Sequence, residues 1–365
     1  MKKTTILIIW VLWAVSMTID AQQVITGRVT DAVDGAPLAG AYIFISNTTI
    51  RTVSDESGNY MITIQGEGVY EIVVSYTGYE TFFYKMDEPK SLHKIDVALE
   101  TKELPEVVIT APKTYSQKDV DLFWRILLGV NPSRRGLEVL NPEKVFFYLN
   151  SDRVLRAFCS EPVLIINHET GYHIRYELKY FQHDYRTEEY IIGGTPHFEE
   201  LEPSNTIQKR QWERRRRDVY SVSLTRFIRA LYTQQLHENG FLLAISNKQR
   251  NLNAAIPITG VARVEQQNLV PVPETDILQI EQERTMVSID SPVYLGCFSN
   301  PVTSSIIKDS YNRMMGTKYS FPVLILLPQQ IDIYTDGTYS GILSINEIRN
   351  RISGLSAMLP IEYAY

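Results

Sequence analysis

The chain has 365 residues, the length of two ordinary domains or of three small ones. Its 44% hydrophobic and 21% charged residues exclude a disordered or collagen-like chain. A net charge of -6 argues against a dedicated nucleic-acid binder, and 2 cysteines exclude a disulfide-rich scaffold or a four-thiolate zinc site. The 22 tyrosines and 13 phenylalanines favour strands over helices.

The first residues have the pattern of a signal peptide, predicted to span residues 1–21. Lys2 and Lys3 precede an apolar run from Ile6 to Met17, and the small residue Ala21 stands at the expected cleavage point. The apolar run is too short for a spanning helix. We therefore expect an exported protein that is periplasmic or associated with the outer membrane.

Export bears on the two cysteines, because disulfides persist in oxidising compartments. Cys159 and Cys297 could form a disulfide there. The alternative is two separate buried thiols that act as small hydrophobic residues. The sequence leaves both open, because it does not show whether the two Cβ atoms approach each other.

Residues 22–100 are predicted to form a small β-sandwich. Short strand patterns alternate with turn signals such as Asp34-Gly35 and the segment from Asp55 to Gly58. The strand patterns cover residues 24–29, 41–45, 60–64, 70–76 and 92–99. This number of short strands at regular spacing is typical of a sandwich.

Four spaced motifs in this segment resemble a known family. They are Gly27-x-Val29 followed by Asp31, Gly35-x-Pro37-Leu38-x-Gly40-Ala41, Ser54-Asp55-x-x-Gly58-x-Tyr60 and Ser75-Tyr76-x-Gly78-Tyr79. They look like the carboxypeptidase-regulatory-like domain, a transthyretin-like sandwich found at the N-termini of many exported Bacteroidetes proteins. The resemblance implies a non-catalytic folding, spacing or interaction module.

Residues 101–115 are predicted to be a linker, since Pro105 and Pro112 restrict the chain to an extended form. The segment is similar to the one that follows this sandwich in outer-membrane TonB-dependent receptors. The rest of the chain is too short for the barrel of such a receptor.

Residues 116–365 are predicted to form an α+β domain built on an antiparallel sheet. Helix patterns begin at Ser116, span residues 221–239 and begin again at Ser344, where Ile348, Ile352, Leu355 and Leu359 form an apolar stripe. Strand patterns cover residues 145–149, 163–166, 172–180 and 241–245. Strands and helices do not alternate regularly, which favours α+β over a doubly wound sheet.

Several motifs in this half are similar to the C-terminal part of uncharacterised Bacteroidetes proteins that also begin with the regulatory-like sandwich. They are Glu161 to Asn167, Gly171-Tyr172-x-Ile174-x-Tyr176, the expected turn Gly194-x-Pro196-x-Phe198, Tyr220-x-x-Ser223-x-x-x-Phe227, Gly240-Phe241 and Leu359-Pro360-x-x-Tyr363. This resemblance implies an architecture and a compartment but no reaction.

Two histidine motifs are candidates for the zinc ligands of an enzyme. His197 and Glu200 match the first two ligands of a zinc carboxypeptidase, although a polar turn after Gly193-Gly194 explains them more simply. His168, Glu169 and His173 miss the zincin spacing by one residue. On a strand, His173, Arg175 and Glu177 would share one face as a solvated charge ladder. We expect no metal and no cofactor.

Two further patterns suggest binding surfaces. A basic run includes Arg214, Arg215, Arg216 and Arg217, which could meet an anionic partner or form a solvated face paired with nearby glutamates. Tyr172, Tyr176 and Tyr180 could present an aromatic surface to a glycan, or could face the core.

The sequence therefore predicts an exported, non-catalytic interaction or scaffold protein. Its expected partner is an envelope protein or a glycan, and not nucleic acid. The competing hypothesis is an envelope hydrolase, acting on peptide or glycan, with a divergent site in the second domain.

Overall fold

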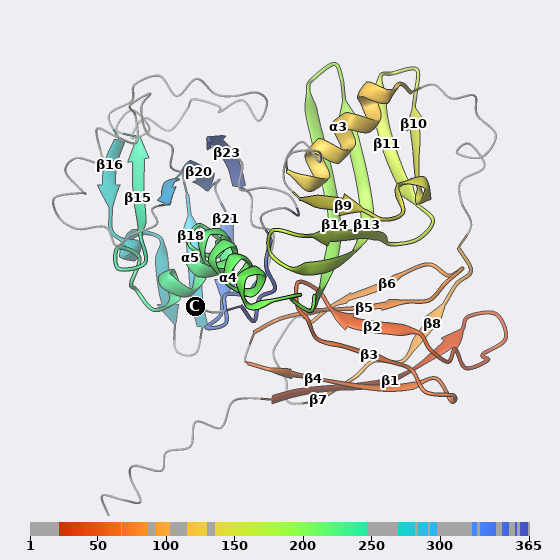
Figure 1. Ribbon diagram of the computed structural model, residues 1–365. Helices are drawn as coiled ribbons and strands as arrows, with labels where there is room; N and C mark the ends of the chain where they lie inside the picture. The colour runs from red at the N-terminus through yellow and green to blue at the C-terminus, as the bar shows by residue number, and fades with distance from the viewer. Residues whose placement is uncertain are drawn as a thin grey trace, which may run out of the picture.

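The computed structural model describes residues 22–66, 68–86, 92–102, 115–129, 136–246, 269–281, 284–290, 293–297, 323–326, 329–340, 345–349, 355 and 358–363. The predicted signal peptide and residues 103–114 of the predicted linker lie outside these ranges. Figure 1 shows three bodies: the N-terminal strands below, a curved sheet above them, and a second group of strands and helices at the left.

The N-terminal body is the predicted sandwich of two sheets. One sheet has the order β4-β1-β7, with β8 also pairing with β1, and the other has the order β3-β2-β5-β6. The strands are β1 (Gln22–Asp31), β2 (Tyr42–Ile45), β3 (Arg51–Val53), β4 (Asn59–Gln65), β5 (Glu71–Ser75), β6 (Phe82–Lys85), β7 (Leu92–Lys94) and β8 (Val97–Leu99). Isoleucines and valines from both sheets, such as Ile25, Ile43 and Val74, fill the core between them.

Gly27 is required where the chain passes close to itself. A Cβ at this position would lie 1.8 Å from the carbonyl oxygen of Ile95, closer than any side chain tolerates. The glycine of the motif Gly27-x-Val29 is therefore required by the close approach of Ile95 inside the sandwich.

The second body is a curved antiparallel sheet covered by one helix. Within the described residues its strand order is β10-β11-β13-β12-β9, and β14 pairs with β13. Its elements are α3 (Gln117–Leu128), β9 (Leu137–Val139), the 3-10 turn η2 (Pro142–Lys144), β10 (Val145–Leu149), β11 (Val154–Cys159), β12 (Val163–Asn167), β13 (Tyr172–Asp184) and β14 (Glu189–Glu200).

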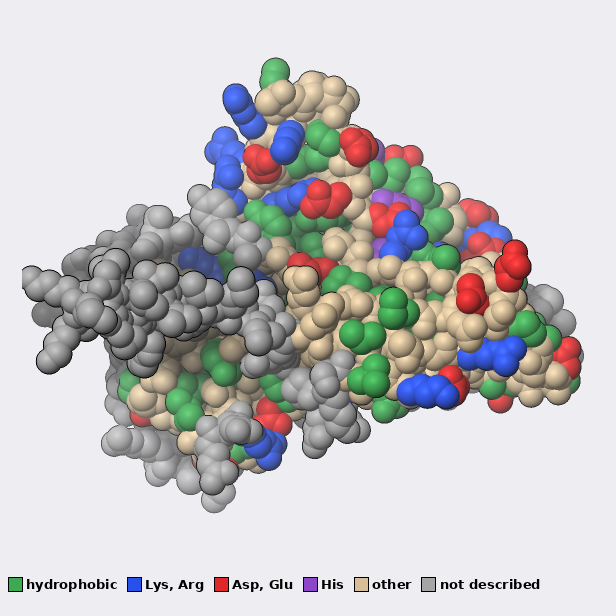
Figure 2. Space-filling view, turned by 90° about the horizontal axis from the view of Figure 1, so that it is seen from below, with side chains coloured by type: hydrophobic (Ala, Val, Ile, Leu, Met, Phe, Trp, Pro, Cys, Tyr) green, Lys and Arg blue, Asp and Glu red, His purple; other side chains and the backbone are tan. Residues whose placement is uncertain are grey.

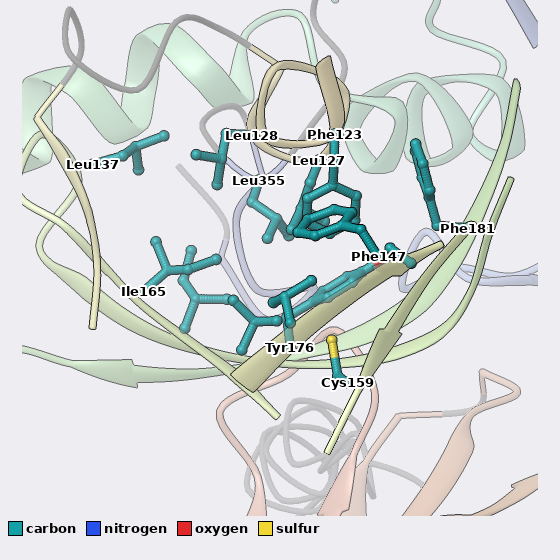
Figure 3. Packing of buried hydrophobic residues seen from close by; sticks show 14 of the residues in the cluster. Phe123, Leu127, Leu128, Leu137, Phe147, Cys159, Ile165, Tyr176, Phe181 and Leu355 are labelled. Atoms are coloured by element: carbon teal, nitrogen blue, oxygen red, sulfur yellow. The ribbon is translucent and has the colours of Figure 1, made fainter. Parts of the chain in front are cut away.

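Helix α3 begins at the predicted residue and buries Phe123, Leu127 and Leu128. The carboxylate of Asp119 accepts hydrogen bonds from the backbone N–H and the hydroxyl of Ser116, which satisfies the helix start. Phe123 packs edge to face against Phe147 and Phe181, with ring centroids 5.2 and 4.9 Å apart. Figure 3 shows this core between α3 and the inner face of the sheet.

The third body contains helices α4 and α5 and two further sheets. Their described orders are β16-β15-β19-β20-β23 and β17-β18-β21-β22. The elements are α4 (Thr206–Tyr220), α5 (Leu224–Tyr232), β15 (Phe241–Ser246), β16 (Leu269–Val272), the 3-10 turn η4 (Glu274–Asp276), β17 (Leu278–Glu281), β18 (Arg284–Ile289), β19 (Val293–Cys297), β20 (Val323–Leu326), β21 (Gln329–Ile333), β22 (Tyr339–Ser340) and β23 (Ile345–Arg349). Phe227, Leu231 and Phe241 belong to its own hydrophobic core.

Arg229 of α5 connects the third body to the C-terminal segment through hydrogen bonds. Its guanidinium donates hydrogen bonds to the backbone oxygens of Asp336, Ile361 and Tyr363, at 3.0, 2.6 and 2.9 Å. The carboxylate of Asp336 in turn accepts a hydrogen bond from Tyr70 of the sandwich. One arginine therefore links α5, the β21–β22 turn and the segment after residue 358.

One helix prediction in this half is wrong, and another is confirmed only in part. The helix predicted from Ser344 is the strand β23 where it is described, because residues 345–349 pair with β20. Ser344 and Ile352 lie outside the described residues, whereas Leu355 and Leu359 pack on the core of the second body. Pairing across a sheet here overrides a helical pattern.

The helix predicted for residues 221–239 is shorter than expected and follows a helix that the pattern did not predict. Helix α5 ends at Tyr232, and α4 precedes it. The buried positions of α4 are Trp212, Arg216 and Val219. Because the central residue of this buried stripe is an arginine, the sequence does not show the apolar periodicity expected of a helix.

Gly193 and Gly194 lie inside the strand β14, so the turns predicted at these glycines are not formed. Tyr180 and Tyr176 occupy the space over the two glycines: a Cβ would lie 2.3 Å from Tyr180 Cζ at Gly193 and 2.6 Å from Tyr176 Cζ at Gly194. Cross-strand tyrosines thus take the place of the missing side chains.

We expect Phe123→Ala to destabilise the second body strongly. Phe123 is fully buried against two other rings, and its truncation should lower the free energy of unfolding by about 3–5 kcal/mol. Urea denaturation measures the change. The control is Lys118→Ala on the exposed side of the same helix, for which a change beyond about 0.5 kcal/mol would contradict the packing described.

Candidate functional site

The charged residues of β13 and β14 face the β-sandwich. His173, Arg175 and Glu177 alternate with core residues along β13, and they pair across the hairpin with Glu199, His197 and Thr195. Figure 1 places this hairpin directly above β2, β5 and β6. We call this contact the hairpin–sandwich interface.

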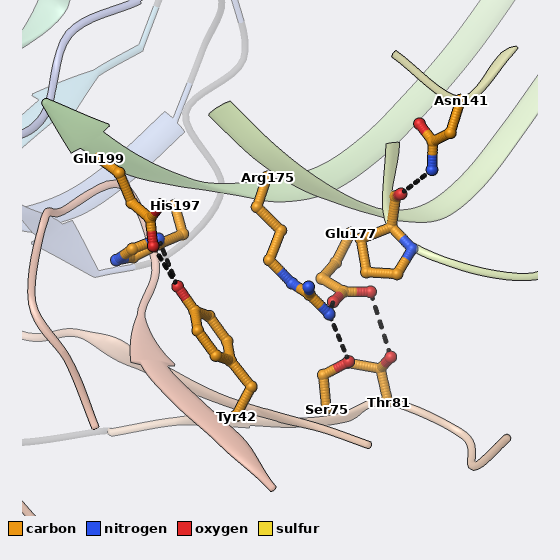
Figure 4. Close-up of polar contacts among 9 residues, drawn as sticks. Tyr42, Ser75, Thr81, Asn141, Arg175, Glu177, His197 and Glu199 are labelled. Carbon is orange, nitrogen blue, oxygen red and sulfur yellow. Dashed lines mark hydrogen bonds and ion pairs between the residues drawn. The ribbon is translucent and has the colours of Figure 1, made fainter. Parts of the chain in front are cut away.

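His197 is at the centre of one half of the interface and is fully buried. Its Nδ1 lies 3.1 Å from the hydroxyl of Tyr42, which also donates a hydrogen bond to Glu199 at 3.0 Å. Nε of Arg51 is 3.0 Å from the same carboxylate oxygen of Glu199. Figure 4 shows how Tyr42 reaches from β2 toward both residues of β14.

Arg175 and Glu177 form the other half. The guanidinium of Arg175 donates to Ser75 at 3.2 Å and to Glu177 at 3.3 Å, and Glu177 accepts a hydrogen bond from Thr81 at 3.2 Å. The guanidinium also lies 4.8 Å from the centre of the Tyr42 ring. Lys179 and Glu71 form a salt bridge in the same row of contacts. Backbone hydrogen bonds between the sandwich and β14 add to these side-chain contacts.

Backbone hydrogen bonds hold the two bodies in one register. The N–H of Asn47 donates to the carbonyl of Pro196 at 2.8 Å, and the N–H of Phe198 donates to the carbonyl of Thr48 at 3.0 Å. Ile361 adds a third bond, from its N–H to the carbonyl of Asn47 at 2.7 Å. The β2–β3 turn is therefore bonded to β14 on one side and to the C-terminal segment on the other.

Burial controls the charges at this interface. It lowers the pKa of His197 to about 4, and this outweighs the opposing effects of the Thr49 backbone and the Glu199 charge. Burial opposes ionisation of Glu199, but hydrogen bonds from Tyr42 and His173 and the charge of Arg51 hold its pKa below the ordinary value. The interface therefore combines a neutral histidine with an ionised glutamate near neutral pH.

The candidate zinc motif that was weighed against a polar turn is not assembled. His197 and Glu200 are three residues apart on a strand, so their side chains leave opposite faces of the sheet. Glu200 pairs with Arg216 at 2.9 Å, on the face away from the sandwich. Within the described ranges, no group of three histidine, cysteine or acidic side chains is placed to hold a metal ion.

The ladder of His173, Arg175 and Glu177 shares one strand face as predicted, but it is not solvated. Glu177 is only 5% exposed, and it accepts a hydrogen bond from Thr81, which lies between β5 and β6 of the sandwich. His168 lies outside the strand and pairs with Glu138 instead. In Figure 2, histidine side chains reach the surface next to acidic and basic side chains.

The basic run divides into two groups along α4. Arg216 is buried, donates to the carbonyl of Thr170 at 2.7 Å and lies over the ring of Tyr172. Arg215 pairs with Glu169 at 3.0 Å. Arg214 is exposed and Arg217 is half-buried, whereas Arg215 and Arg216 attach the helix to the second body.

The tyrosines do not form one surface. Tyr172 and Tyr176 belong to the core of the second body, which is the second of the two alternatives that the sequence left open for them. Tyr180 is 53% exposed, because a β-bulge between Leu178 and Tyr180 turns it to the other face of the sheet.

Cys159 and Cys297 are free thiols that lie in different cores, so the alternative of a disulfide between them is not formed. Burial raises the pKa of each thiol to about 12. Both therefore act as small hydrophobic residues, which is the other alternative that the sequence left open.

Sequence reasoning missed the sandwich side of the interface. Tyr42 and Arg51 are 155 and 148 residues away from His197 and Glu199, respectively, and nothing in their local pattern marks them. The one available signal was the density of alternating charges on a strand with buried tyrosines. Such charges often require partners from another part of the chain.

Comparison with known proteins agrees with the N-terminal assignment. Residues 25–109 match the family model of the CarboxypepD_reg-like domain. No curated protein matches the chain. None of the helices in the described part is long and apolar enough to cross a membrane.

Several solved structures show partial similarity. A type II cohesin–X-dockerin complex from Acetivibrio cellulolyticus aligns with 20% identity and a TM-score of 0.18, over 20% of this chain and 52% of that one. A streptococcal ancillary pilin aligns with 12% identity and a TM-score of 0.19, over 52% and 61%. A DUF3823 family protein from Bacteroides ovatus aligns with 9% identity and a TM-score of 0.18, over 85% and 97%.

The lowered pKa of His197 predicts a loss of stability in acid. The unfolded chain binds a proton near pH 6.5 and the folded protein only near pH 4, so stability is complete above pH 6.5 and falls through this window. The loss from this residue should reach about 2 kcal/mol at pH 5. Urea unfolding at pH 7.5, 6 and 5 measures it.

His197→Asn keeps a neutral hydrogen-bonding group near Tyr42 and removes the titration. This variant should be less stable at pH 7.5 but should lose less stability between pH 6.5 and 5. His168→Asn is the matched control at an exposed histidine. An equal slope in the wild type and the His197 variant would contradict the burial of an uncharged imidazole.

Proposed function

We propose that the protein is an exported, non-catalytic interaction protein of the periplasm or outer membrane, in which the sandwich supports the second body. The observation that carries the proposal is the hairpin–sandwich interface. Its histidines, arginines and glutamates bind one another and the side chains of β2, β3 and β5. A supporting domain has to hold its neighbour in one orientation. The charge pairs of the hairpin–sandwich interface do this, because each pair forms only when the two bodies are aligned.

The CarboxypepD_reg-like domain supports the same proposal. In this chain the sheet β3-β2-β5-β6 contacts the chain's own second body, which is what a spacing module would do. The signal-like pattern of residues 1–21 supports export. We assign the partner-binding role to the second and third bodies.

Export is tested by expressing the full chain and recovering it from cell fractions. We expect the recovered protein to begin at Gln22 and to be found in the periplasmic or outer-membrane fraction. A chain that retains residues 1–21 and remains in the cytoplasm would contradict the proposal. Affinity purification of the tagged protein from cross-linked envelopes, followed by mass spectrometry, then tests for partners. Turnover of peptide or glycan substrates by the purified protein would favour the hydrolase instead.

A further inference from the structure

The outer face of the curved sheet carries aromatic and polar side chains that the core does not use. Helix α3 covers the inner face, to which Phe147, Leu155 and Ala157 contribute. Because side chains alternate along strands, their neighbours point the opposite way. These outward residues are Phe146, Tyr148, Arg156, Phe158, Tyr180 and Gln182, which we call the outer aromatic face.

The strand register arranges this face in two rows. Phe146 lies opposite Phe158 in one row. Tyr148 lies opposite Arg156, and Arg156 lies opposite Gln182, in the other. Neighbouring strands are roughly 4.8 Å apart, so the row of Tyr148, Arg156 and Gln182 spans roughly 10 Å from β10 to β13, which is about the length of a disaccharide.

Tyr180 supplies a flat ring. Its Cζ, hydroxyl and Cε1 atoms would all lie within 2.7 Å of a Cβ on Gly193, so the ring lies directly over the backbone of β14. One ring face is thus in contact with the strand, and 53% of the residue is exposed. A tyrosine needed only for packing would be covered, as Tyr176 is over Gly194.

The polar ends of this face have no partner among the residues that the structure describes. Within the described part of the chain, neither Arg156 nor Gln182 makes a side-chain hydrogen bond or an ion pair, and the hydroxyls of Tyr148 and Tyr180 make no hydrogen bond. By contrast, Arg175 and Glu177 on the same sheet are paired with the sandwich. The donors and acceptors of the outer aromatic face are therefore available to a ligand.

We propose that the outer aromatic face binds an oligosaccharide. Sugar rings present apolar C–H faces that stack on flat aromatic side chains, and hydroxyls that bond to arginine, amide and phenol groups. Tyr180 takes one sugar ring, while Arg156 and Gln182 bond to its hydroxyls and Tyr148 contacts the next unit. This assignment rests on the proposed function, because it names the class of partner that the second body recognises.

The test uses the purified full chain on an array of neutral and acidic oligosaccharides, followed by calorimetric titration of the best-bound one. We expect Tyr180→Ala and Arg156→Ala each to weaken binding by roughly tenfold or more. Tyr180→Phe should retain most of the affinity, because it keeps the ring. Thermal unfolding of each variant verifies that it is folded.

Tyr190→Ala is the matched control. Tyr190 is 51% exposed on the neighbouring strand, but it lies opposite His183 on the other face of the sheet. Retained binding in this variant supports the assignment, whereas equal loss in both tyrosine variants overturns it. Absence of binding to every glycan on the array also overturns it.

The outcome is distinguishable from failure of the proposed function. Correct export with a protein partner, together with no glycan binding, leaves the interaction role intact and rejects the oligosaccharide. Loss of that protein partner in Tyr180→Ala would identify the outer aromatic face as a protein docking surface instead.

Discussion

The structure depends on the β13–β14 hairpin, because its inner face is buried under α3 and part of its outer face is buried against the sandwich. Its inner face carries Ile174, Tyr176 and Phe198 into the core under α3. Its outer face carries Arg175, Glu177 and His197 against the sandwich. A charge buried in this position is costly unless it is paired, so each of these groups specifies where the sandwich must lie. The interface therefore contributes orientation more than net stability.

The contact with the sandwich also determines which part of the hairpin is available to a ligand. Where the hairpin lies over the sandwich, its polar groups are used internally and are not available to a ligand. Beyond the bulge at Lys179 the hairpin extends past those contacts, and its outward residue Tyr180 is exposed. The bulge thus separates the supporting part of the sheet from the part that we assign to recognition.

The sequence predicts those features that depend on local pattern. Alternation along β13, the start of α3 and the strands and glycines of the sandwich were predicted because each follows from neighbouring residues. Helix α4 was missed because Arg216 takes an apolar position by bonding to Glu200 and to backbone oxygens. The strand β14 was missed because its glycines are covered by tyrosines of the adjacent strand. Contacts such as Tyr42 with His197 depend on the tertiary fold and leave no local mark.

Native-state hydrogen exchange tests most directly whether the sandwich and the second body are one cooperative unit. Leu155→Ala removes a fully buried side chain from the core of the second body only. If the hairpin joins the two bodies, amides of β2 and β5 in the sandwich should lose protection together with those of β11 and β13, by a similar factor. Faster exchange confined to the second body, with β2 and β5 unchanged, would contradict the account.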